Sequence, residues 1–154
     1  MDRGINEVAV TFTNNDYGKG LSDSFVNAFK AMGGSVTAEV PHEDGKGDYS
    51  AEVSTLSASG AKEVAVLGYV DQGGRGIIQN SMETGAFSRF ILADGMIGDS
   101  LIENVDGDLS GTFGTLPGSE SEGANMFKSL ASSNDIPGDG PFEPESYDAA
   151  ALIM

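Results

Sequence analysis

The sequence predicts an α/β fold: a three-layer, doubly wound domain built around a mostly parallel sheet of five strands. Segments typical of strands alternate with segments typical of helices, the loops between them are short, and 154 residues is about one domain. Strands that alternate with helices form βαβ units, which place helices on both faces of a parallel sheet. The five strands are expected at residues 7–13, 35–40, 62–70, 89–95 and 109–117.

The first half of the chain supplies two strands and two helices. EVAVTFT at 7–13 alternates apolar and polar residues, which is typical of a strand. The segment 21–34 has apolar residues at helical spacing and ends in a glycine pair. SVTAEV at 35–40 predicts the second strand, and the helix at 48–60 is expected to begin with Asp48 as its N-cap.

The middle of the chain continues the alternation. KEVAVLGYV at 62–70 is strongly apolar and predicts a central strand, and a helix with a glycine-rich start is expected at 71–86. RFILADG at 89–95 predicts the fourth strand and 98–105 a short helix. The fifth strand, at 109–117, is weakened by glycines.

The last segments are a helix at 122–133, a loop at 134–144 that holds three of the five prolines, and a helix at 145–154. This final helix is still apolar where the sequence stops, and it has no cap. We therefore expect the chain to be a piece of a longer protein.

Composition excludes several classes of partner. The chain has 24 Asp and Glu against 8 Lys and Arg, a net charge of -16, which argues against nucleic acid and against anionic membrane surfaces. There are no cysteines, so disulfides and thiolate chemistry are excluded. No apolar run approaches the roughly 20 residues that span a bilayer, and the N-terminus does not resemble a signal peptide. We expect an acidic, solvated surface and no direct membrane insertion.

Candidate binding residues follow the strands, because ligands of open α/β sheets bind at the carboxyl ends of the strands. Tyr17 follows the first strand, Tyr69 the third and Asp94 the fourth. A carboxylate can accept hydrogen bonds from a ligand ammonium group, and each tyrosine offers a hydroxyl and a ring face. Singly, each tyrosine could instead pack on its own helix and Asp94 could cap the next one. Three such residues on three strand ends favour a binding site.

Other kinds of site fit the sequence less well. A dinucleotide fingerprint would need glycine where Asp23 stands, and two loops that resemble calcium sites carry Leu109 and Pro137 at unsuitable positions. The only histidine, His42, is expected in an exposed loop with no catalytic serine or cysteine partner. No cofactor or metal and no catalytic residue is therefore predicted.

Several segments resemble one known family. NNDYGKGLSDSF, AMGGSV, DYSAEVSTL, GYVDQGGRGIIQ, ADGM and ESYDAAAL are similar, in this order, to the second lobe of periplasmic solute-binding proteins of the branched-chain amino acid type. Members of that family are receptors of ABC importers. They have two α/β lobes of the type I periplasmic binding protein fold, and they trap a ligand in the cleft between the lobes. The resemblance implies a ligand-binding lobe at 1–144 and the start of a crossover helix, toward a second lobe, at 145–154.

The resemblance also implies roles for individual residues. Tyr17 and Tyr69 would contact a bound amino acid, and Asp94 would hold its ammonium group. Relatives commonly have Glu at the position of Asp94, so the shorter side chain suggests a bulkier or differently placed ligand. The ligand-binding set that we expect is Tyr17, Tyr69, Asp94, Asp71, Gln72 and Met96.

The function implied is capture of an amino acid or related small molecule in the periplasm, with ABC permease subunits as partners of the full-length protein. Two alternatives remain open at this point. One is a ligand-sensing domain of the same fold in a signalling or regulatory protein. The more distant one is a small α/β enzyme that uses the same strand-end carboxylates.

Overall fold

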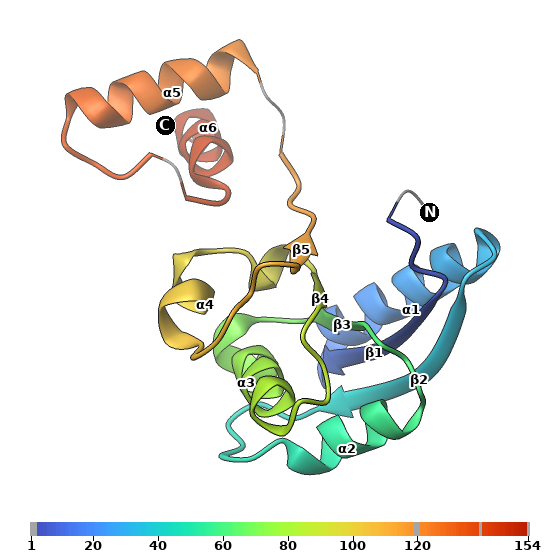
Figure 1. The fold of residues 1–154 in the computed structure, drawn as a ribbon. Helices are drawn as coiled ribbons and strands as arrows, with labels where there is room; N and C mark the ends of the chain where they lie inside the picture. Colours follow the sequence, from blue (N-terminus) through green and yellow to red (C-terminus); the bar gives the residue numbers. More distant parts are fainter. Residues whose placement is uncertain (1–2, 119–120, 139, 154) are drawn as a thin grey trace. The chain divides into compact units, whose positions relative to one another are not determined.

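The structure is a computed structural model that describes residues 3–118, 121–138 and 140–153 (Figure 1). The chain forms two compact units, which divide between Thr115 and Leu116. The first unit contains the sheet and the second contains two helices. The predicted boundary between residues 144 and 145 refers to a larger two-lobe protein and stays a prediction.

The first unit confirms the predicted fold class. Its sheet has the order β2-β1-β3-β4-β5, and all four pairings are parallel. The elements are β1 (Glu7–Thr13), α1 (Asp16–Ala31), β2 (Ser35–His42), α2 (Ser50–Ala58), β3 (Val64–Leu67), the irregular turn η1 (Val70–Gly74), α3 (Arg75–Thr84), β4 (Phe90–Leu92), the short turn η2 (Asp94–Met96), α4 (Asp99–Asn104) and β5 (Phe113–Gly114).

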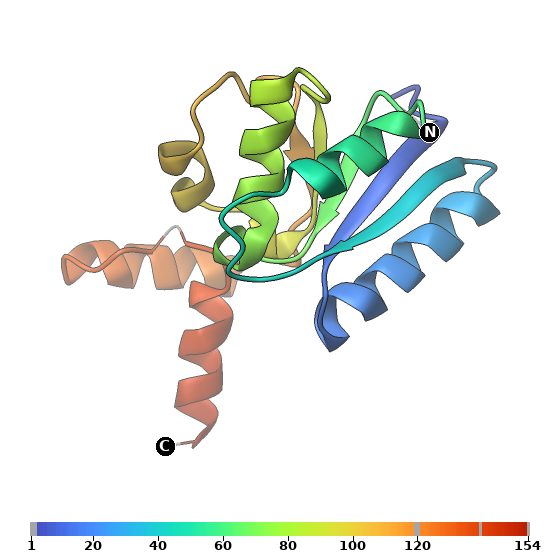
Figure 2. The same ribbon diagram turned by 90° about the horizontal axis from the view of Figure 1, so that it is seen from below.

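Helices cover both faces of this sheet, with α1 on one face and α2 and α3 on the other (Figure 2). Alternate residues of β1 face opposite ways, which explains the two separate cores. Val8 and Val10 pack with Val26 and Phe29 of α1. Ala9 packs in the second core, whose other members include Val53, Leu56, Val64, Val66, Ile77, Ile78, Phe90 and Met96.

Helix α1 begins five residues earlier than the sequence predicted. Asn15 is its N-cap, and the Asn15 Oδ1 atom accepts a hydrogen bond from the Gly18 backbone N–H at 2.8 Å. Asn is among the preferred N-cap residues because its side chain satisfies one of the exposed N–H groups of the first turn. Tyr17 therefore lies in the first turn of a helix and is held by it.

Strand β2 is longer than predicted, and His42 is its last residue. The expectation that His42 lies exposed in a loop is wrong, because its side chain is 0% exposed. The preceding Pro41 does not end the strand, since β2 is at the edge of the sheet and pairs only with β1. Proline is tolerated in an edge strand, where its missing N–H breaks no ladder.

The predicted starts of two other helices differ from the observed starts of α2 and α3. Asp48 is not the N-cap of α2, which begins at Ser50; its carboxylate accepts hydrogen bonds from the N–H and hydroxyl of Ser50 at 3.0 and 2.7 Å. The predicted helix at 71–86 is broken at its start, because Gly73 has a φ of 95° that helical residues do not adopt. Only the later part, α3, is helical.

The second unit consists of α5 (Glu122–Ser133) and α6 (Glu143–Ile153). The bounds predicted for the first of these helices are confirmed, and Ser121 caps it by accepting a hydrogen bond from the Ala124 N–H at 3.1 Å. The two helices meet where the rings of Phe127 and Tyr147 lie 5.4 Å apart. None of the helices in the described parts of the chain is long and apolar enough to cross a membrane.

Two glycines in α1 are expected to respond oppositely to alanine. A Cβ on Gly18 would lie 2.1 Å from the Thr13 carbonyl oxygen, whereas a Cβ on Gly20 would meet nothing within 4 Å. Gly18→Ala should therefore lower the free energy of unfolding by about 1–3 kcal/mol, because the strand backbone has to move. Gly20→Ala should raise it by about 0.5–1 kcal/mol, because alanine favours the helix. Urea unfolding of both variants checks this pair, and equal effects would contradict it.

Candidate ligand-binding site

Three side chains predicted to form a site meet at the carboxyl edge of the sheet. Tyr17 is in the first turn of α1, Tyr69 follows β3 and Asp94 follows β4. The rings of Tyr17 and Tyr69 stack, with centroids 4.7 Å apart and planes inclined by 28°. The Tyr17 hydroxyl donates a hydrogen bond to the Asp94 Oδ1 atom at 2.5 Å. We call Tyr17, Tyr69 and Asp94 the strand-end triad.

Glycines allow the strand ends to approach this closely. A Cβ on Gly95 would lie 2.3 Å from the Gly68 carbonyl oxygen and 2.8 Å from the Tyr69 ring. A Cβ on Gly68 would in turn lie 2.0 Å from the Thr13 Oγ1 atom. Real Cβ atoms do not make such contacts. Glycine at position 95 therefore lets the Tyr69 ring pack against the backbone beside Asp94, and glycine at position 68 lets the end of β3 lie against Thr13.

The protonation of Tyr17 follows from its surroundings. Burial raises its pKa, and the hydrogen bond to Asp94 raises it further, since both favour the neutral phenol. The phenol therefore stays protonated and donates to the carboxylate. This bond occupies only one oxygen of Asp94, and among the described residues Oδ2 has no hydrogen-bond partner.

This arrangement is suited to a ligand that carries a positive charge. The half-buried carboxylate presents one unoccupied oxygen to an ammonium group, and charge-assisted bonds of this kind are among the stronger hydrogen bonds in proteins. The two aromatic rings beside it can stabilise the same cation and pack against apolar parts of the ligand.

The other three predicted residues differ in their placement. Asp71 is exposed, and Gln72 accepts a hydrogen bond at its Oε1 atom from the Asn15 side chain at 3.3 Å. Met96 is 0% exposed and belongs to the core on the side of α2 and α3. η2 directs the Met96 side chain into this core, so Met96 does not line the edge of the sheet. The prediction that Met96 contacts the ligand is therefore wrong.

A hollow of about 460 Å³ adjoins the triad at Gly95. Its walls come from η1 and the start of α3 on one side and from η2 and α4 on the other. The lining residues are Val70, Asp71, Arg75, Gly95, Ile97, Ser100 and Asn104.

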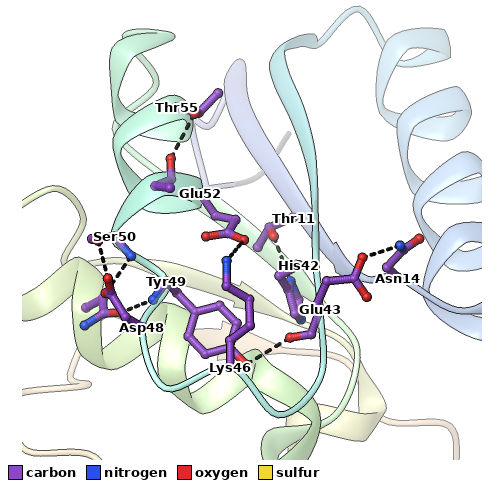
Figure 3. A network of polar contacts seen from close by, with 12 residues as sticks. Thr11, Asn14, His42, Glu43, Lys46, Asp48, Tyr49, Ser50, Glu52 and Thr55 are labelled. Atoms are coloured by element: carbon purple, nitrogen blue, oxygen red, sulfur yellow. Dashed lines mark hydrogen bonds and ion pairs between the residues drawn. The ribbon is translucent and has the colours of Figure 1, made fainter.

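The sequence did not reveal a buried polar chain beneath this edge, and Figure 3 shows the contact between His42 and Thr11 that begins it. His42 Nδ1 lies 2.8 Å from the Thr11 hydroxyl, and His42 Nε2 lies 3.1 Å from the Thr13 hydroxyl. Thr13 also donates to the Gln72 carbonyl oxygen at 3.4 Å. Since a hydroxyl has a single hydrogen and Thr13 donates it to Gln72, the Thr13 oxygen accepts from Nε2–H. Burial lowers the pKa of His42, so the ring is neutral and Nδ1 accepts from the Thr11 hydroxyl. These contacts link β1 and β2 to η1.

Two signals in the sequence could have indicated this chain. Thr11, Thr13 and His42 would all point to the same face if the alternation of β1 and β2 were continued through Pro41. The two threonines also interrupt an otherwise apolar strand that is buried from its second residue onward. Buried hydroxyls require partners, and the one histidine at the end of the neighbouring strand supplies them.

Comparison with known families and proteins gives a consistent result. The profile of the family described as periplasmic binding protein matches residues 1–148. A curated relative from Pseudomonas aeruginosa, described as an amino acid binding protein, is 30% identical over 149 residues, which cover 92% of this chain and 37% of the relative. The chain therefore spans about two fifths of the length of the curated relative it matches.

Solved structures share the fold. A leucine binding protein, LivK, from Thermotoga maritima superimposes with a TM-score of 0.74 at 24% identity, over 91% of this chain and 40% of that one. A solute binding protein of an ABC transporter from R. palustris, in complex with 4-hydroxybenzoate, superimposes with a TM-score of 0.75 at 20% identity. This match covers 99% of this chain and 44% of that one. These identities establish the fold alone. The matched family consists of binding proteins, in agreement with the prediction that the chain is not an enzyme.

Proposed function

Because this chain belongs to the periplasmic binding protein family, we propose that it forms one ligand-binding lobe of the solute receptor of an ABC importer. The ligand in this proposal is an amino acid or a related small molecule that carries an ammonium group. The receptor acts in the periplasm and delivers its ligand to permease subunits.

The strand-end triad is the observation on which this proposal depends. Its carboxylate has one oxygen engaged by Tyr17 and one without a partner in the described part of the chain, beside two stacked rings. An ammonium group at Oδ2 would complete the hydrogen bonding of Asp94 and lie within reach of both rings. The description of the P. aeruginosa relative as an amino acid binding protein supports the same ligand class.

In this proposal the triad forms one wall of a cleft, and a second lobe, outside this chain, forms the other. The ligand binds the closed arrangement of the two lobes more tightly than the open one and so shifts the population toward it. A sensor domain of the same fold would use the same wall but would couple to a signalling partner. Permease and ATPase genes beside the parent gene would favour the importer.

A thermal-shift screen of the complete two-lobe protein tests the proposed ligand class. A compound that binds only the folded state raises the melting temperature by mass action. We expect amino acids to raise it, and their analogues without the amino group to have little effect. If no ammonium-bearing compound raises the melting temperature, the proposed function is wrong.

The 154-residue chain alone is expected to bind amino acids only weakly. Half of the polar partners of the ligand would come from the second lobe, and a single wall leaves the ligand largely in solvent. Calorimetric titration with leucine should give no sub-micromolar binding. Sub-micromolar binding would show that the chain contains a complete site and would contradict the two-lobe arrangement.

A further inference from the structure

The hollow beside Gly95 contains two opposite charges that the chain leaves unpaired. Asp71 in η1 and Arg75 at the start of α3 are both exposed and both line this hollow. In the described part of the chain, neither side chain makes a hydrogen bond or an ion pair. Both are therefore available to a ligand.

Arg75 is one of the bases that have no ion pair in the described part of the chain, as are Lys30 and Lys62. The chain has three carboxylates for every base, 24 against 8, and Lys19, Lys46 and Arg89 each pair with one. Arg75 also lines a second hollow, between the loop after β2 and α3, which does not include Gly95. The hollow at Gly95 is the relevant one because Gly95 follows Asp94 in the chain and packs against the Tyr69 ring.

The Tyr69 ring connects the hollow to the triad. One face of this ring stacks on Tyr17, and its edge packs against Gly95, where an added Cβ would lie 2.8 Å from the ring. Gly95 is next to Asp94 in the chain and lines the hollow. A ligand whose ammonium group is at Asp94 would therefore extend along the ring, past Gly95, toward Arg75.

We propose that the ligand is an amino acid whose side chain ends in a carboxamide or a carboxylate, and that Arg75 is the residue that selects it. This inference rests on the proposed function of the strand-end triad. A guanidinium has five N–H donors in a planar fork and no acceptor, so it pairs with planar oxygen-bearing groups. A carboxamide would also donate to the Asp71 carboxylate, whereas a side-chain carboxylate would be repelled by it.

A branched aliphatic side chain would bind this hollow poorly. It would remove water from Arg75 and Asp71 and offer them no hydrogen bond, and burying unpaired polar and charged groups is costly. The hollow therefore favours ligands with polar side chains and also disfavours leucine-like ligands.

Calorimetric titration of the complete two-lobe protein with L-glutamine, L-glutamate and L-leucine tests this inference. We expect the unmodified protein to bind glutamine or glutamate at least about tenfold more tightly than leucine. Arg75→Gln should remove this preference by weakening glutamine or glutamate binding, whereas leucine affinity should stay the same or rise, because leucine no longer removes water from a charged group there. Arg75→Lys should have an intermediate effect. Asp71→Asn distinguishes the two ligands, because it should weaken glutamine binding and strengthen glutamate binding.

Lys62→Gln is the matched control. Lys62 is exposed and lies before β3, at the opposite end of that strand from Tyr69, and the substitution changes the net charge as Arg75→Gln does. It should leave all three affinities within about twofold of those of the unmodified protein.

Two results would overturn this inference and leave the proposed function standing. One is equal or tighter binding of leucine by the unmodified protein. The other is an equal loss for all three amino acids in Arg75→Gln, since this residue would then hold the carboxylate that every amino acid shares. If none of the three binds, the inference also fails, and the wider screen of ammonium-bearing compounds decides whether the proposed function fails with it.

Discussion

Asp94→Asn is expected to weaken the binding of an ammonium-bearing ligand by roughly 10- to 100-fold in the complete protein, because a hydrogen bond to a charged group contributes about 1.5–3 kcal/mol. Asparagine keeps the shape of the side chain and can still accept from the Tyr17 hydroxyl. It loses the negative charge that faces the ligand. The dissociation constant from calorimetric titration, compared with that of the unmodified protein, measures the effect.

The matched control for this prediction is Asp99→Asn. Asp99 is exposed at the start of α4, so this substitution makes the same chemical change away from the triad. Its effect on affinity should be within about twofold. Equal losses in both variants would mean that Asp94 acts only through the overall charge, and its contact with the ligand would then be ruled out.

Tyr17→Phe separates the hydroxyl from the ring in the triad. It removes the hydrogen bond to Asp94 and keeps the stacking on Tyr69. We expect a loss of roughly 2- to 10-fold, because a typical hydrogen bond contributes about 0.5–1.5 kcal/mol. A loss as large as that of Asp94→Asn would indicate that the hydroxyl also contacts the ligand directly.

The fold could be predicted because its signals are local and repeated. The residues of β1 alternate between two cores, and β3 is an apolar run buried on both faces. Each segment can therefore be identified as a strand from its own residues alone. β5 was predicted with nine residues but has two, Phe113 and Gly114, which pair with Ile91 and Leu92 of the three-residue β4. Its length depends on a neighbouring strand, which the pattern of its own segment does not contain.

The triad could be predicted because parallel strands bring their carboxyl ends to one edge whatever lies between them in sequence. That rule fixes the position of Tyr17, Tyr69 and Asp94, but it does not fix the direction of each side chain. Met96, two residues after Asp94, points into the core because η2 turns the backbone. His42 is buried because the Thr11 and Thr13 hydroxyls of the neighbouring strand satisfy both of its ring nitrogens. These threonines precede His42 by 31 and 29 positions in the sequence, so no local pattern indicates the contact.

Burial makes His42 a titrating group that opposes folding in acid. Burial lowers its pKa to about 4, and this effect outweighs the nearby carboxylates of Glu52 and Glu43, which raise it. In the unfolded chain its pKa is about 6.5. Between these two pKa values His42 is protonated in the unfolded state and neutral in the folded state. The free energy of unfolding therefore falls as the pH falls from about 6.5 toward 4.

The 154-residue chain is therefore expected to lose about 2 kcal/mol of unfolding free energy through His42 between pH 7 and pH 5. Urea unfolding at both pH values, for this chain and for His42→Gln, isolates the effect, because glutamine does not titrate and the acidic groups are common to both. NMR gives a second measurement that needs no variant. His42 is the only histidine of the chain, so its ring signal is assigned without ambiguity, and it should titrate well below pH 5. A midpoint between pH 6 and 7 would mean that the ring is accessible to water, and the buried link between β1, β2 and η1 would then be ruled out.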